Sequence, residues 1–220
     1  MGSGYLTYHG VKKDYSVFKA SVDGSLTEVT AEMLDGATKI YNYAFQNYDV
    51  LTSIVIPSSV TSIGNMAFYN CTSLASVTIP SGVTSIGDSA FGDCSSLTSI
   101  DIPSGVTSIG SSAFSGCRAL TSIDIPDGVT SIGMHAFSYC IALTSIDIPS
   151  SVTSIGERGF SNCSVLASVT VEATTPPTLG TNVFNGTHAN LVIYVPSESV
   201  EAYKSANRWS AYASRIQAIT

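Results

Sequence analysis

A 23-residue unit recurs along most of this chain, and the recurrence limits the possible folds more than any other feature of the sequence. The unit reads Leu-x-Ser-Ile-x-Ile-Pro-x-x-Val-Thr-Ser-Ile-Gly-x-x-Ala-Phe-x-x-Cys-x-x. It begins at Leu51, Leu74, Leu97, Leu120, Leu143 and, more loosely, Leu166. A short unit that repeats at a constant period predicts a solenoid, in which each coil contacts only its neighbours. Equivalent residues of successive coils then form columns along the solenoid axis.

Each unit predicts two short strands and a turn. Residues 51–56 place apolar side chains at inward positions of a strand, so we expect their Leu and Ile residues to face the core. Pro57 ends this strand because proline cannot donate a hydrogen bond to a strand ladder, and residues 60–63 predict a second short strand. Gly64 permits a bend, after which residues 65–70 predict a short helical turn. Its expected N-caps in three successive coils are Asn65, Asp88 and Ser111.

The N-terminal end of the chain departs from the repeat and predicts a cap. Within residues 1–36, an alternating stretch at 15–22, the turn signal Asp23-Gly24 and a returning stretch at 25–29 predict a β-hairpin. Such a hairpin would cover the open sheet edge of the first coil, which would otherwise favour aggregation.

Residues 37–196 form the predicted repeat array, and residues 197–220 predict a helical cap that begins at Ser197. The residues that recur at helical spacing in this cap are Val200, Tyr203, Trp209, Tyr212 and Ile216. The expected fold class is therefore a β-rich α/β solenoid. It is a superhelix of about seven 23-residue coils that forms one structural unit with its N-terminal β-hairpin cap and C-terminal helical cap.

Charge is sparse and unevenly distributed along the chain. Only 11% of the residues are charged, and the range from Asp49 to Glu172 holds nine acidic residues against Arg118 and Arg158. A net charge of −7, equal to that of the whole chain, therefore lies between Asp49 and Glu172. Because a negative field repels phosphate backbones, we expect no binding to nucleic acid.

Neither a membrane span nor a secretion signal is evident in the sequence. No apolar run approaches the roughly 18–20 residues that cross a bilayer, so we expect no membrane insertion. The first residues, Met1-Gly-Ser-Gly-Tyr5, show no basic region followed by an apolar segment.

The cysteine column is the first candidate site, with one thiol per coil. Its members are Cys71, Cys94, Cys117, Cys140 and Cys163. Cα atoms about 4.8 Å apart would suit a disulfide, but five thiols cannot all pair, and the histidines show no metal-ligand spacing. We therefore expect a column of buried free thiols that fill small gaps in the core, with no metal or other cofactor.

A row of carboxylates on the outward column of the first strand is the second candidate site. Asp101, Asp124 and Asp147 occupy the same position in successive coils. At about 5 Å spacing, neighbouring carboxylates repel one another by about 1 kcal/mol in water. The row can be a solvated stripe, a contact for a basic partner, or a Ca²⁺ site, although calcium favours ligands on an enclosing loop. The serines beside it, expected as hydrogen-bond partners, are Ser99, Ser122 and Ser145.

One irregular coil is the third candidate site. Where other coils mostly carry Ser, Asp, Gly or Thr, this coil carries Met134, His135, Tyr139 and Ile141. Arg118 holds the position of Ile141 one coil earlier, and Glu157 and Arg158 flank the segment from the next coil. Aromatic, Met and Arg side chains together favour a protein interface, whereas the alternative is scattered surface variation.

The residues of the array do not favour an enzyme. The sequence has no Gly-x-Ser-x-Gly elbow, no glycine loop for phosphate, and no His and acid paired with a nucleophile in repeat register. A hydroxyl without a base beside it stays unactivated. We therefore expect a non-enzymatic protein.

The repeat unit resembles the BspA-like leucine-rich repeat of bacterial surface proteins. The resemblance rests on Leu-Thr-Ser-Ile-Asp-Ile-Pro-x-x-Val-Thr-Ser-Ile-Gly-x-x-Ala-Phe-x-x-Cys, and the tail with Thr175-Pro-Pro, Tyr194-Val-Pro and Trp209 is similar to the terminal segment of that family. It covers roughly residues 37 to 215. The resemblance implies a leucine-rich-repeat superhelix in a secreted or surface-attached protein that adheres to host proteins or other cells.

Two functional hypotheses of different classes follow. The first is a protein-binding or adhesion module of a secreted or cell-surface bacterial protein, with a protein or cell-surface ligand such as a host extracellular protein. The second is a structural, phage-associated (virion) or intracellular protein that uses the same scaffold as a spacer or as an inhibitor of another protein. One scaffold serves many partners, so the fold alone does not separate the two.

Overall fold

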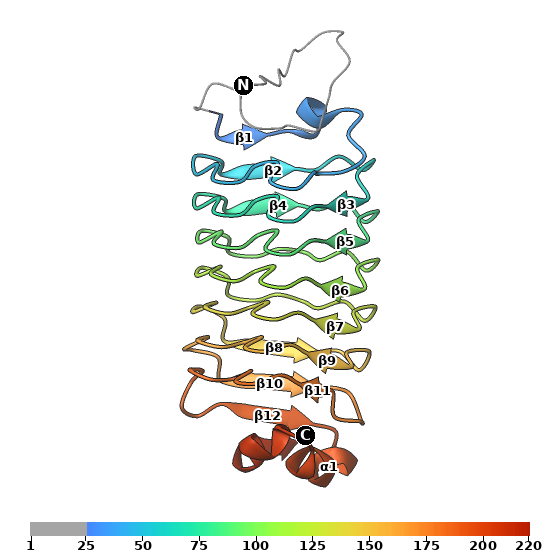
Figure 1. Ribbon diagram of the computed structural model, residues 1–220, viewed down its shortest axis with the longest axis vertical. Helices are drawn as coiled ribbons and strands as arrows, with labels where there is room; N and C mark the ends of the chain where they lie inside the picture. The colour runs from blue at the N-terminus through green and yellow to red at the C-terminus, as the bar shows by residue number, and fades with distance from the viewer. Residues whose placement is uncertain (1–25) are drawn as a thin grey trace.

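The structure is a computed structural model that describes residues 26–220. It is an elongated stack of coils with the C-terminal helical segment at one end (Figure 1). Successive coils pair through parallel strands whose partners lie 23 residues apart, such as Ser62 with Ser85 and Ser131 with Ser154. One 23-residue period of the sequence therefore forms one coil of the solenoid. The predicted β-rich leucine-rich-repeat class is confirmed.

The second short strand of each unit builds one continuous sheet along the array. Its order is β11-β9-β7-β6-β5-β3. The strands are β3 (Ser62–Ile63), β5 (Ser85–Ile86), β6 (Ser108–Ile109), β7 (Ser131–Ile132), β9 (Ser154–Ile155) and β11 (Thr178–Leu179). The inward Ile side chains, and Leu179 in β11, are buried, whereas the Ser side chains, and Thr178 in β11, remain exposed or partly exposed. The predicted second strand is thus confirmed.

The first strand of each unit builds a sheet that is interrupted. One part has the order β1-β2-β4, and the other has the order β13-β12-β10-β8. The strands are β1 (Glu28–Val29), β2 (Ser53–Val55), β4 (Ser76–Thr78), β8 (Ser145–Ile148), β10 (Ser168–Val171), β12 (Val192–Val195) and β13 (Ile216–Ala218). Residues 97–102 and 120–125 lie between the two parts and form no strand.

The expectation of a first strand in every coil was therefore wrong for these two coils. They carry Asp101 and Asp124, which the 23-residue register places in one column with Asp147 of the following coil. Like charges opposed across neighbouring strands are destabilising, and the interruption coincides with this row. Beyond it, Asp147 pairs with Thr170 in regular register between β8 and β10.

The segment after the second strand is not the helical turn that we expected. Residues 64–70 form consecutive turns in which Met66 and Asn70 have positive φ angles of 53° and 59°. Their amides donate to the next coil instead of to their own, at 2.8 Å to the Asp88 and Gly92 carbonyls. Two left-handed residues per coil thus turn alternate amides along the solenoid axis, and this third side is hydrogen-bonded between coils.

The residues predicted as helix N-caps serve as links between coils. The side-chain oxygen of Asn65 accepts the Asp88 amide at 3.0 Å, and that of Asp88 accepts the Ser111 amide at 2.7 Å. The glycine column is required by the same close approach. A Cβ atom on Gly64 would lie 2.5 Å from the amide nitrogen of Asn42 in the preceding coil. Glycine is therefore required because the coils approach too closely for a side chain, and not because the backbone bends there.

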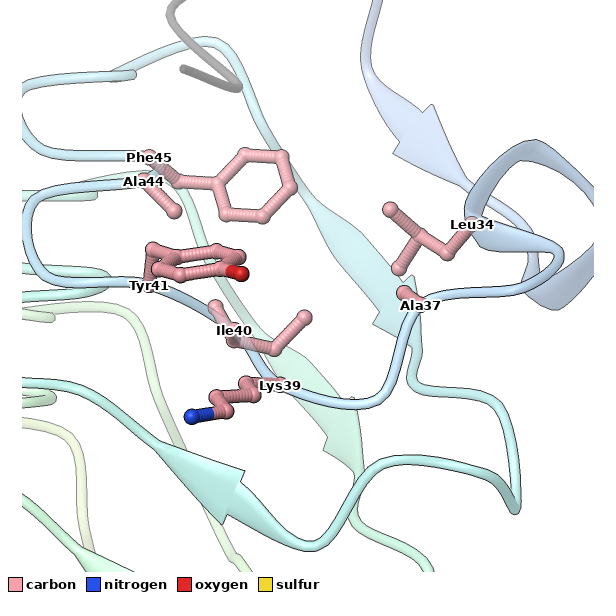
Figure 2. A pocket seen from close by; sticks show the side chains of 7 residues that line it. All are labelled: Leu34, Ala37, Lys39, Ile40, Tyr41, Ala44 and Phe45. Carbon is pink, nitrogen blue, oxygen red and sulfur yellow. The ribbon is translucent and has the colours of Figure 1, made fainter. Parts of the chain in front are cut away.

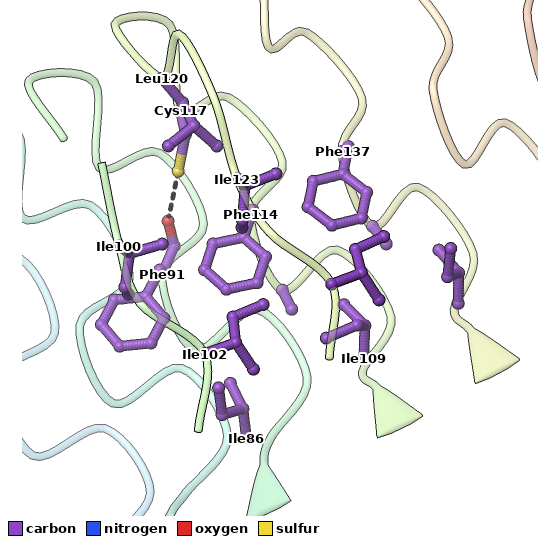
Figure 3. Packing of buried hydrophobic residues seen from close by; sticks show 14 of the residues in the cluster. Ile86, Phe91, Ile100, Ile102, Ile109, Phe114, Cys117, Leu120, Ile123 and Phe137 are labelled. Carbon is purple, nitrogen blue, oxygen red and sulfur yellow. Dashed lines mark hydrogen bonds between the residues drawn. The ribbon is translucent and has the colours of Figure 1, made fainter. Parts of the chain in front are cut away.

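A stack of phenylalanine rings forms the centre of the core. Phe45, Phe68, Phe91, Phe114, Phe137, Phe160 and Phe184 lie in one column. Consecutive ring centroids are 5.1–5.7 Å apart and nearly parallel. The Ile and Leu residues of both strands pack around the rings (Figure 3). The predicted inward positions, such as Leu51, Ile54 and Ile56, are buried.

The C-terminal segment covers the end of this stack. It consists of a 3₁₀ helix (Ser197–Ser199), α1 (Val200–Ser205), a second 3₁₀ helix (Trp209–Arg215) and β13. Trp209 packs on Phe184 with ring centroids 6.2 Å apart, and its indole N–H donates to the Pro177 carbonyl at 2.8 Å. The predicted helical cap therefore exists, with Trp209 buried beneath it.

Two details of this cap differ from the prediction. Ser197 does not cap a helix but is the first residue of a 3₁₀ helix, and its hydroxyl donates to Glu198. Ile216 continues no helix but lies in β13, which pairs in parallel with β12. The last residues therefore hydrogen-bond to the open edge of β12 instead of continuing the helix that their spacing predicts.

At the N-terminal end, the predicted β-hairpin lies largely outside the described residues. Of the stretch predicted to return from the turn, β1 forms and pairs in parallel with β2 through Val29 and Ile54. It is followed by a 3₁₀ helix (Ala31–Leu34). The edge of the first coil is therefore extended by at least one strand.

Replacement of Phe114 by Ala should lower the free energy of unfolding by about 3–5 kcal/mol, because it opens a cavity in the ring stack. Phe114 is fully buried between Phe91 and Phe137. Urea unfolding of the wild type and the variant measures the change. Thr107→Ala, at an exposed position of the same coil, is the control and should change the value by no more than about 0.5 kcal/mol. An unchanged stability of Phe114→Ala would contradict the role of the stack.

Candidate functional site

A small recess lies at the N-terminal end of the described array. It is lined by Leu34, Ala37, Lys39, Ile40, Tyr41, Ala44 and Phe45 (Figure 2). Its empty volume is about 220 Å³, including open solvent. Pockets for small molecules usually have about 300–1,000 Å³ and several convergent polar groups. The recess offers one ammonium group and one phenol, so its chemistry does not define a site.

The cysteine column lies inside the core, as predicted. All five thiols are buried and free. Each one donates to the carbonyl of the phenylalanine in the preceding coil, for example Cys117 to Phe91 at 3.1 Å (Figure 3). The sequence analysis identified the thiols as gap fillers but missed this hydrogen bond. The thiol is a second donor to this carbonyl, which also accepts the main-chain amide three residues later, as Phe91 does from Cys94 at 3.3 Å.

Burial makes these thiols poor nucleophiles. Removal from water raises the pKa of Cys71 to about 12 and raises the pKa of Cys94 and of Cys117 well above the ordinary value of a thiol. The pKa of Cys140 is raised as well, first through its contact with Cys163 and then through burial. Because the thiolate is the reactive form, the column is structural.

The carboxylate row is exposed, as predicted. Asp101, Asp124 and Asp147 all lie on the water-facing side, with Ser99, Ser122 and Ser145 exposed beside them. Within the described residues, no hydrogen bond joins these carboxylates to the serines, so the expected serine partners are not found. Among residues 26–220, no group of three or more His, Cys, Asp or Glu side chains is arranged to hold a metal ion.

The irregular coil, residues 134–141, presents the largest exposed apolar side chains of the central array. Met134 is 50% exposed, Tyr139 51% and Ile141 40%. In the next coil, Val165 is 39% exposed. We call these four exposed side chains of two successive coils, Met134, Tyr139, Ile141 and Val165, the apolar patch. Arg118 is exposed one coil before Ile141 in the same column.

Tyr139 occupies a position that disfavours tyrosine. It has a left-handed backbone with φ 62°, and left-handed geometry costs about 1–2 kcal/mol for a residue with a Cβ atom. The other members of its column are residues that tolerate this geometry, namely Asn47, Asn70, Asp93, Gly116, Asn162 and Gly186. The backbone of Tyr139 is held there by its amide, which donates to the Ser161 carbonyl at 2.9 Å.

This strain was missed in the sequence analysis, although the sequence contained the signal. A column of Asn, Asp and Gly indicates a left-handed position, and Tyr139 is its exception. Left-handed residues occur in every coil, Met66 and Arg158 among them, so what distinguishes Tyr139 is a large exposed ring at a position where the other coils carry Asn, Asp or Gly. The irregular coil is therefore the strongest candidate for a binding surface.

A buried hydroxyl network supports the irregular coil from below. The Ser138 hydroxyl donates to the Arg158 carbonyl at 2.7 Å and lies 3.1 Å from the Ser161 hydroxyl. The Nδ1 atom of His135, which is partly buried, lies 3.2 Å from the same Ser138 hydroxyl. Since Ser138 is fully buried and its proton is directed to a carbonyl, this His and Ser pair orients the turn instead of activating a nucleophile.

With the fold and these surfaces described, comparison with known proteins defines the class. Two overlapping stretches of the chain, residues 38–164 and 84–210, match the family model of the BspA type leucine rich repeat region in six copies. The matched stretches together cover most of the chain. The chain therefore belongs to the BspA-type leucine-rich repeat family, as its repeat unit suggested.

A solved structure agrees with this assignment. The chain is similar to the leucine rich repeat protein TpLRR of T. pallidum, with 32% sequence identity, a TM-score of 0.66, and coverage of 73% of this chain and 76% of that chain. None of the curated proteins matches the chain.

Two further structures show a weaker likeness. A leucine rich cell surface protein of Faecalibacterium prausnitzii has 28% identity and a TM-score of 0.44 over 78% of this chain and 69% of that chain. The pneumococcal vaccine antigen PcpA has 14% identity and a TM-score of 0.43 over 89% of this chain and 76% of that chain. In the described residues, no helix is both long and apolar enough to span a membrane.

The buried thiols predict a loss of stability at alkaline pH. Their folded pKa values exceed the unfolded value near 8.5, so the stabilisation is complete below that pH and declines as the pH rises. From pH 8 to pH 9.5, urea unfolding should show a falling free energy of unfolding. In the double variant Cys94→Ala/Cys117→Ala the fall should be shallower, although the variant is less stable throughout. Equal slopes for the two proteins would show that the thiols do not ionise on unfolding.

Replacement of Tyr139 by Asn should stabilise the protein by about 1 kcal/mol, because Asn tolerates the left-handed backbone. Thermal and urea unfolding measure the effect. The same substitution at Tyr194, in the extended strand β12, is the matched control and should destabilise the protein, since Asn is a poor strand former. Destabilisation by both substitutions would indicate that Tyr139 is not strained.

Proposed function

We propose that this chain is a non-enzymatic protein-binding module of a secreted or surface-displayed bacterial protein. The observation that carries the proposal is the irregular coil, where Met134, Tyr139 and Ile141 are exposed on an array whose outer surface otherwise consists largely of hydroxyls. Large exposed apolar side chains are costly in water and gather where a protein meets a partner.

The scaffold supports such a role because it leaves the outer side chains free to vary. Some outer side chains such as Asn65 link coils, but Tyr139 bonds to the next coil through its main-chain amide, so its side chain can change without altering the pitch. A rigid array also lowers the entropic cost of binding, since few groups need to be ordered on contact.

Membership of the BspA-type family supports a location at the bacterial surface. The repeat belongs to the BspA type, and the resemblance implies secretion or attachment to the bacterial surface. The protein would contact a protein or cell-surface ligand there, by the irregular coil or by the carboxylate row of Asp101, Asp124 and Asp147.

A binding panel tests the proposal. Immobilised extracellular-matrix and bacterial-surface proteins are each titrated with the full chain, and saturable binding is measured by surface plasmon resonance. We expect at least one protein of the panel to bind and to lose at least about tenfold affinity, or about 1.4 kcal/mol, with variants of one of the two surfaces. These variants are Met134→Ser/Ile141→Ser and Asp101→Lys/Asp124→Lys/Asp147→Lys. Thr84→Ser, at an exposed position elsewhere, is the control and should bind normally. Binding that no surface variant alters would contradict the proposal.

A further inference from the structure

The basic side chains of the central array gather around the apolar patch. Between Asp49 and Glu172 the chain has nine acidic residues but only two arginines, Arg118 and Arg158. Both are at the irregular coil, and the single histidine of this range, His135, lies in the coil itself. The patch is thus the one part of an otherwise acidic array where cationic side chains gather.

Repeat register places the two arginines on opposite sides of the patch. Arg118 precedes Ile141 by one coil in its column, a step of 5.5 Å as measured between the rings of Phe114 and Phe137. Arg158 follows His135 by one coil, and its carbonyl accepts the Ser138 hydroxyl.

Both guanidinium groups are available to a partner. Arg118 is exposed and forms no ion pair within residues 26–220. The side chain of Arg158 is 49% exposed, and its only ion pair in this part of the chain is a long one, 3.9 Å to Glu157. An exposed pair at this distance contributes little, so a partner's carboxylate can replace it at small cost.

The main chain around Tyr139 shows how its exposed ring is presented to a partner. The amide of Tyr139 is held by the Ser161 carbonyl, and the carbonyl of Ser138 accepts the Gly116 amide at 2.8 Å. The main chain on both sides is therefore fixed, and the left-handed φ angle directs a large ring outward from a rigid turn. A rigid aromatic anchor beside arginines is the usual composition of an interface centre.

We infer that the apolar patch binds a protein segment that presents apolar side chains flanked by Asp or Glu residues. This inference rests on the proposed function and names the partner chemistry of one of its two surfaces. Tyr139, Met134 and Ile141 receive the apolar side chains, and Arg118 and Arg158 receive carboxylates, which guanidinium groups bind with two parallel hydrogen bonds. The acidic remainder of the array repels the same partner and so orients it on the patch.

A random dodecapeptide library displayed on phage, selected on the immobilised full chain, tests this inference. The enriched peptides should be acidic and should contain aromatic or aliphatic residues. Synthetic copies of these peptides, titrated by fluorescence anisotropy, should bind at least about tenfold more weakly to Arg118→Glu/Arg158→Glu and to Tyr139→Asn. Rising salt should weaken their binding to the wild type. Thermal unfolding of each variant establishes that it is folded.

The triple variant Asp101→Lys/Asp124→Lys/Asp147→Lys serves as the matched control and should bind these peptides within about threefold of the wild type or more tightly, since it lacks only like charges. Enrichment of basic peptides that this variant no longer binds would overturn the inference and leave the proposed function intact. Peptides insensitive to the variants at Arg118, Arg158 and Tyr139, or no enrichment over the Tyr139→Asn protein, would also overturn it. Concentration-dependent dimers that both charge variants abolish would identify a second copy as the partner instead.

Discussion

The hydrogen bonding of each coil to the next is the constraint on which the whole structure depends. Every coil can bond to its neighbour through strands and through the turn segment, where amides such as those of Met66 and Asn70 are turned along the solenoid axis. These bonds require the same main-chain path in successive coils, and a constant path brings equal side chains into columns. The rings from Phe45 to Phe184 stack because the main-chain path repeats from coil to coil. Positions such as Gly64 must be glycine, because the neighbouring coil leaves no room for a Cβ atom.

A constant main-chain path also places identical side chains next to one another where their contact is unfavourable. Apolar rings and thiols benefit from stacking because each buries the surface of the next. Neighbouring carboxylates repel one another instead, and the first sheet is interrupted at residues 97–102 and 120–125, the coils that carry Asp101 and Asp124 of the carboxylate column. The interruption is tolerated because the second sheet and the turn segment remain continuous beside it. A solenoid with several bonded sides can therefore carry an unfavourable column on one of them.

The same argument explains why recognition would concentrate at one place on the array. Outer positions change freely without altering the pitch, yet most of them carry hydroxyl side chains. The irregular coil departs from this pattern with an exposed ring at the strained Tyr139 and with Arg118 and Arg158 on either side. Exposed aromatic and basic side chains that add nothing to the core are typical of surfaces that bind a partner.

The periodicity of the sequence by itself determined the pitch, the inward columns, the buried thiols and the family, because a 23-residue period admits few ways to bury Leu, Ile and Phe together. It also singled out Met134, His135, Tyr139 and Ile141 as exceptions. Only the tertiary structure decided that residues 65–70 form left-handed turns, that Asn65 and Asp88 link coils, and that Ile216 joins a sheet. These outcomes depend on bonds to residues 22 or 23 positions away, which compete with local helical preference. The sequence pattern of a single coil cannot show these bonds, since their partner atoms lie in a neighbouring coil.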